Sequence, residues 1–76
     1  MKAKLEFDLD NEDDVVQYKM MNMANNMHMF IWQYDQELRR KVKYDESLTE
    51  EQYKVWEQAR EIFYDKLNEY KIDLDL

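Results

Sequence analysis

The chain has 76 residues with no cysteine, glycine or proline and one histidine, and its 11 basic and 18 acidic residues give a net charge of −7. This composition excludes a disulfide framework and thiolate zinc sites, and it excludes the glycine-rich loops that bind nucleotide phosphates. Nucleic acids and anionic membranes would be repelled, so the composition favours a positively charged partner.

The length allows a single domain over residues 1–76. A chain of this size buries only about 60% of the surface that it exposes when unfolded, and self-association is the remaining way to enlarge its core. Hydrophobic residues make up 45% of the chain, which is too many for a disordered tail. No segment approaches the roughly 20 apolar residues of a membrane span, and MKAKLEF lacks a signal-peptide core. We therefore expect a soluble, intracellular protein.

Both ends of the chain alternate between apolar and charged residues, which is typical of half-buried strands. The apolar positions are Ala3, Leu5, Phe7 and Leu9 at the amino end and Ile72, Leu74 and Leu76 at the carboxyl end. Two short strands are therefore predicted to bracket the chain.

A helix is predicted to begin after Asp10 and Asn11, either of which can cap it, with acids in its first turn. Asn25 and Asn26 favour caps and turns, so we expect a break or kink near Asn25. From Met27 the helix is predicted to resume, with one apolar face and a basic last turn. The face consists of Met27, Ile31, Tyr34, Leu38 and Val42, and the basic cluster of Arg39, Arg40, Lys41 and Lys43.

A capping box marks the start of the last helix, with Thr49 as N-cap and Gln52 three residues later. That helix is predicted to reach about Tyr70 and, because the connection is short, to pack antiparallel on the helix from Met27 to Tyr44. The expected fold class is α+β in the order β-α-α-α-β. Its helical hairpin would lie against a small sheet of the two terminal strands, and exposed strand edges would favour a homodimer.

The sequence offers no catalytic constellation and no metal site. Asp8, Asp10 and Glu12 superficially resemble a calcium loop, but Asp13 and Lys19 stand where that loop needs glycine and glutamate. His28 has no cysteine or second histidine to act with. We predict a non-enzyme without a cofactor.

Two sets of acidic residues are predicted to bind a basic partner. The first set, here called the acidic pole, surrounds the start of the first helix. The second set, the acidic stripe, follows one side of the last helix. Helix residues four apart are separated by a rise of about 6 Å, which is comparable to the spacing of phosphates along a nucleic-acid strand. The pole contains Asp8, Asp10, Glu12, Asp13 and Asp14, and the stripe contains Glu50, Glu57, Glu61 and Asp65.

Five methionines in MMNMANNMHM form either core or an adaptable docking patch. Met27 and Trp32 are the candidate apolar anchors of such a patch. Asp35 and Arg39 are expected to form an exposed ion pair beside Trp32.

The order of KAKLEFDLD, FIWQYDQELRRKVKYDE, SLTEEQY and EIFYDKLNEY resembles a group of small acidic phage proteins, mostly without assigned function. Members commonly carry proline or glycine after the first strand and near the middle turn, and this chain has neither. The resemblance implies a phage origin and a role in host takeover in the host cytoplasm. One similar class comprises inhibitors that occupy the DNA-binding surface of the nucleoid-associated protein HU.

These observations predict a non-catalytic inhibitor that blocks the nucleic-acid-binding surface of a basic host protein by DNA mimicry. One alternative is a structural or scaffolding homodimer that docks partners through its Met and aromatic surface. Another is a nucleic-acid-dependent factor that uses the basic cluster at Arg39 to Lys43.

Overall fold

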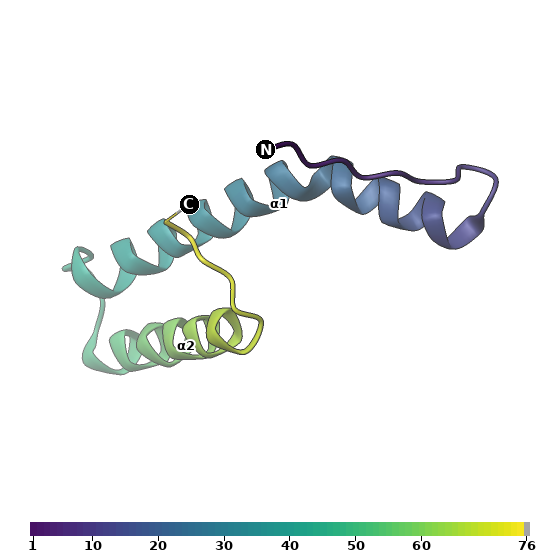
Figure 1. Cartoon of the computed structure of the whole chain (residues 1–76). Helices are drawn as coiled ribbons and strands as arrows, with labels where there is room; N and C mark the ends of the chain where they lie inside the picture. The colour runs from purple at the N-terminus through teal and green to yellow at the C-terminus, as the bar shows by residue number, and fades with distance from the viewer. Residues whose placement is uncertain (76) are drawn as a thin grey trace.

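A computed structural model describes residues 1–75, which form two α-helices and contain no strand. Helix α1 spans Glu12–Lys43 and helix α2 spans Glu50–Glu69. The helices form an antiparallel hairpin in which α2 covers the C-terminal half of α1, while the N-terminal half of α1 projects beyond it (Figure 1). The predicted α+β class is therefore wrong, although its helical hairpin is present.

Both helix starts lie where the capping residues predicted them. The Asn11 side chain accepts hydrogen bonds from the backbone N–H groups of Asp13 at 3.0 Å and Asp14 at 3.1 Å. At α2, the Gln52 N–H donates to the Thr49 hydroxyl at 3.2 Å and the Thr49 N–H donates to the Gln52 side chain at 3.0 Å. These bonds satisfy backbone donors that have no partner within the helix.

The predicted break near Asn25 is wrong, because α1 continues through Asn25 and Asn26. Asparagine costs a helix interior only about 0.7 kcal/mol relative to alanine, far less than the roughly 3 kcal/mol of proline. The cost of the two asparagines is smaller than the free energy gained by extending a helix that has already formed, and the chain has no proline or glycine that would add to that cost.

The predicted terminal strands are also wrong within the described residues. The amino-terminal segment runs back along the projecting half of α1, and the carboxyl-terminal segment crosses from α2 toward the middle of α1 (Figure 1). Phe7 packs on Tyr18 with ring centroids 5.7 Å apart, whereas Leu5 and Leu9 stay 70% and 59% exposed. A strand needs a neighbouring strand for its backbone hydrogen bonds, and each terminus lies against a helix instead. Leu76, in the second predicted strand, lies outside the described residues.

The end of α2 has the backbone bonds of a Schellman motif. The Ile72 N–H donates to the Leu67 carbonyl at 2.9 Å and the Lys71 N–H donates to the Asn68 carbonyl at 3.2 Å. This motif requires a left-handed residue after the helix end, a position that glycine usually occupies; the chain has no glycine, and Lys71 takes the position with a φ of 54°. Beyond this turn, His28 Nε2 bonds the Asp73 carbonyl at 3.1 Å and ties the carboxyl-terminal segment to α1.

The core between the helices is small. Leu38 of α1 and Leu67 of α2 are the buried hydrophobic residues, at 2% and 7% exposure. The fold measures 54 × 30 × 20 Å and has a radius of gyration of 17.7 Å, whereas a compact chain of this length has one of about 11 Å. One copy therefore leaves much of its apolar surface uncovered.

Candidate functional site

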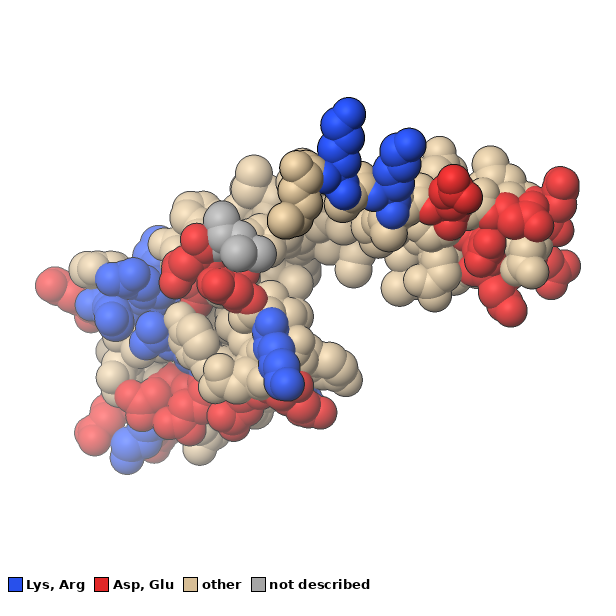
Figure 2. Space-filling model, in the orientation of Figure 1, with Lys and Arg blue, Asp and Glu red and all other residues tan. Residues whose placement is uncertain are grey.

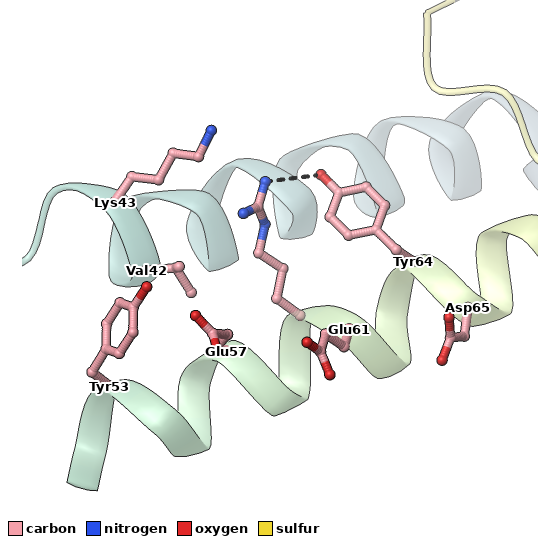
Figure 3. Close-up of a pocket in the computed structure, with 8 residues that line it drawn as sticks. Val42, Lys43, Tyr53, Glu57, Glu61, Tyr64 and Asp65 are labelled. Atoms are coloured by element: carbon pink, nitrogen blue, oxygen red, sulfur yellow. Dashed lines mark hydrogen bonds between the residues drawn. The ribbon is translucent and has the colours of Figure 1, made fainter. Parts of the chain in front are cut away.

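An open groove of about 760 Å³ lies between α2 and the C-terminal end of α1 (Figure 3). Helix α2 contributes most of its wall because residues three and four apart share one helix face. The lining residues are Val42, Lys43, Tyr53, Glu57, Arg60, Glu61, Tyr64 and Asp65.

Three of the four predicted stripe residues, Glu57, Glu61 and Asp65, line this groove. They make no ion pair within residues 1–75, whereas Glu50 lies 3.8 Å from the Lys54 ammonium. The structure thus brings three unpaired carboxylates to one wall. The fourth lies at the start of α2, where its charge complements the helix dipole and an exposed lysine offsets it.

A buried carboxylate behind the groove bonds one of its lining residues, Tyr64. Asp35 is only 8% exposed and accepts a hydrogen bond from the Tyr64 hydroxyl. Arg60 Nη2 donates to the Tyr64 oxygen at 3.5 Å, and its guanidinium lies 5.1 Å from the centre of the Tyr64 ring. Burial raises the pKa of Tyr64, the hydrogen bond to Asp35 raises it further, and Arg60 opposes both effects.

Tyr53 stands at the other end of the groove beside Glu57, toward which it points (Figure 3). Hydrogen bonding to Glu57 and the charge of that carboxylate raise the pKa of the Tyr53 hydroxyl. The groove thus combines three carboxylates and two tyrosine rings with two cations of this chain, Lys43 and Arg60, and its lining carries a net charge of about −1. Carboxylates and tyrosine rings are the groups that bind lysine and arginine side chains, through charge and through the ring faces.

The acidic pole lies elsewhere. Figure 2 shows acidic side chains gathered at the start of α1 and, separately, along α2. Two pole residues hold the local turn: Asp14 Oδ2 accepts from the Asp8 N–H at 2.8 Å, and Asp8 Oδ1 accepts from the Asp10 N–H at 3.0 Å. The pole and the stripe are thus two separate surfaces of one copy.

The two predicted apolar anchors do not share a surface. Met27 is 48% exposed and lies in an apolar hollow with Met23, Phe30 and Ile31. Trp32, 43% exposed, lines a different hollow between α1 and the carboxyl-terminal segment. Five residues turn a helix by about 140°, which separates the two side chains.

Three of the four residues of the basic cluster, Arg40, Lys41 and Lys43, lie in the last turn of α1, where a helix end was predicted, and two of them are paired. Arg40 bonds Glu37 at 2.9 Å, and Lys41 bonds Asp45 at 3.3 Å while its Nζ lies 5.5 Å from the centre of the Trp56 ring. The side-chain hydrogen bond with Glu37 raises the pKa of Arg40. Pairing of this kind lowers the positive potential that a nucleic-acid ligand would meet.

Sequence reasoning missed the buried role of Asp35. We expected an exposed ion pair with Arg39, but Asp35 faces α2 and bonds Tyr64. The signal was present in the spacing, because Asp35 is in phase with Ile31, Leu38 and Val42, the predicted apolar face.

Within residues 1–75, no group of three or more His, Asp or Glu side chains is arranged to hold a metal ion. Neither helix has a stretch long and apolar enough to cross a bilayer. Comparisons with protein-family models, curated proteins and solved structures give no match. The phage origin and the HU-type target therefore stay predictions.

Proposed function

We propose that this protein is a non-catalytic binding protein whose groove along α2 receives a lysine- and arginine-rich segment of a basic, nucleic-acid-binding host protein. The observation that carries the proposal is the row of three unpaired carboxylates, Glu57, Glu61 and Asp65, on one wall of that groove. A carboxylate left without an ion pair in its own chain is available to a cation of a partner.

The charge density of the stripe supports competition with nucleic acid. Three of its carboxylates, Glu57, Glu61 and Asp65, recur about every 6 Å along the helix, against one phosphate per about 3.4 Å of axis for each DNA strand. This part of the stripe thus has roughly half the linear charge density of a strand. Tyr53 adds a ring on which a guanidinium of the partner can stack, whereas the Tyr64 ring already carries Arg60 of this chain. Electrostatic steering would make association fast and salt dependent.

A basic protein of the bacterial nucleoid is the partner that we propose, because its DNA-binding surface presents the required cations. The test is a gel shift in which this protein competes with a short DNA duplex for purified HU. We expect release of DNA at about 50 mM salt, where HU retains the duplex in the absence of this protein. Direct retention of DNA by this protein alone would overturn the proposal.

Matched variants separate the stripe from net charge. The triple variant Glu57→Gln, Glu61→Gln and Asp65→Asn removes three charges from the groove and is expected to lower competition at least tenfold. The control variant removes three exposed charges elsewhere, through Glu6→Gln, Glu46→Gln and Glu51→Gln. Equal losses from both variants would mean that only total charge matters and would contradict a role for the groove.

A further inference from the structure

An apolar stripe runs along the projecting half of α1 and ends at Tyr34, where Phe63 of α2 packs on it, and about half of its side-chain surface stays exposed in one copy. Its residues recur with the alternating four- and three-residue spacing of a coiled-coil heptad, and each is between 47% and 67% exposed. We call this stripe the seam; it consists of Val16, Met20, Met23, Met27, Phe30 and Tyr34. The amino-terminal segment leaves the seam open, because Phe7 packs on Tyr18, which lies about 200° round the helix from Met20.

We infer that the seam pairs with the seam of a second copy of this chain, antiparallel, to form a homodimer. The accessible surface of one copy is large enough to supply a protein–protein interface. The accessible surface is 7190 Å², roughly 2,100 Å² more than the approximately 5,100 Å² of a compact monomer of 9.6 kDa. A standard protein interface buries about 800 Å² on each partner.

The arrangement of residues along the seam identifies a second copy as the occupant. In an antiparallel pair centred near residue 25, every seam residue faces another seam residue. Val16 then faces Tyr34, Met20 faces Phe30, and Met23 faces Met27 of the other copy. A methionine sulfur against an aromatic ring is a favourable contact. Within each copy, the Phe30 ring is held by stacking on Tyr34 at 6.1 Å, and Tyr34 packs on Phe63 at 5.6 Å.

Charge decides the direction of pairing. The first turn of α1 is acidic and its last turn is basic (Figure 2). Antiparallel pairing brings the acidic pole of one copy toward the basic cluster of the other and aligns the helix dipoles favourably. Parallel pairing would place like charges together at both ends. The pole is thereby assigned to the dimer interface, and the stripe remains for the basic partner of the proposed function.

The first test is the mass in solution. Sedimentation equilibrium is expected to give twice 9.6 kDa for the native chain. The seam variant Met23→Glu and Met27→Glu is expected to give a monomer with less helix. Its matched control, Met21→Glu and Met29→Glu, places the same charges on the same helix but outside the seam, and is expected to stay dimeric. A monomeric native chain, or a control that dissociates as readily as the seam variant, would overturn the inference.

Cysteine cross-linking tests the direction of pairing without depending on a destabilised variant, since the chain has no cysteine of its own. Met20→Cys and Phe30→Cys are made as two single variants, mixed and oxidised. The antiparallel pair gives disulfides between the two variants, whereas a parallel pair would give disulfides within each variant and contradict the assignment. Neither experiment contains a basic partner, so their outcome is independent of the proposed function.

Discussion

The hydrogen bond between Tyr64 and Asp35 is the contact between α1 and α2 whose removal is most informative. Tyr64→Phe deletes the hydroxyl that donates to Asp35 and leaves a carboxylate with 8% exposure without that donor. A hydrogen bond to a charged group contributes about 1.5–3 kcal/mol. Burying one leucine contributes a similar amount, and Leu38 and Leu67 are the hydrophobic side chains that the hairpin buries. We therefore expect the variant to lose about 2 kcal/mol of unfolding free energy.

Urea unfolding followed by circular dichroism measures this loss, at one fixed protein concentration because a dimer gains stability with concentration. Tyr44→Phe is the control, since Tyr44 is 67% exposed and lies beyond the last turn of α1. A double-mutant cycle with Asp35→Ala isolates the pairwise interaction, for which we expect about 1–2 kcal/mol. If Tyr64→Phe costs no more than Tyr44→Phe, or if the cycle gives no coupling, the bond does not stabilise the hairpin.

Three further predictions concern the ends of α2 and the titration of Tyr64. Thr49→Ala removes the capping box and is expected to lower the unfolding free energy by about 1 kcal/mol in the same assay, while Thr49→Ser should retain most of it. Lys71→Gly is expected to raise the unfolding free energy by about 1 kcal/mol because Lys71 holds a positive φ, and Lys71→Ala, which keeps a Cβ, should give no such gain. Since the pKa of Tyr64 is raised in the folded state, its contribution is complete below about pH 10 and is lost as pH rises through the folded value. The native chain should therefore lose stability above about pH 10 more steeply than Tyr64→Phe, and parallel curves would contradict this.

The helix starts could be predicted from the sequence because capping is local chemistry. Asn11 and Thr49 bond backbone groups two or three residues away, so the signal and its structural cause lie in the same short segment. The end of α2 was also predicted to within a residue. Nothing in the sequence indicated the left-handed residue there, because the chain has no glycine to mark it.

The terminal strands could not be predicted correctly because alternation describes a segment and not its neighbour. Phe7 alternates with charged residues as in a strand, yet it packs on Tyr18 of a helix. The predicted break at Asn25 was wrong for a related reason. The helix propensity of asparagine describes one residue, whereas the helical turns on both sides of Asn25 stabilise the helix through it. The candidate site shows the same difference between local and long-range features. The stripe could be predicted from residue spacing along one helix, whereas the hydrogen bond between Asp35 and Tyr64 joins residues 29 positions apart and could not.

The seam and the groove can operate together because no seam residue lines the groove. Phe63 packs on Tyr34 of the seam, whereas Tyr64, about 100° further round α2, lines the groove. An antiparallel dimer therefore leaves both grooves open, one on each copy. Two linked grooves on a partner with two cationic segments raise apparent affinity through effective concentration, without new contacts. In the proposed dimer the stripe would be presented twice, which would offset the modest charge density of one stripe in competition with DNA.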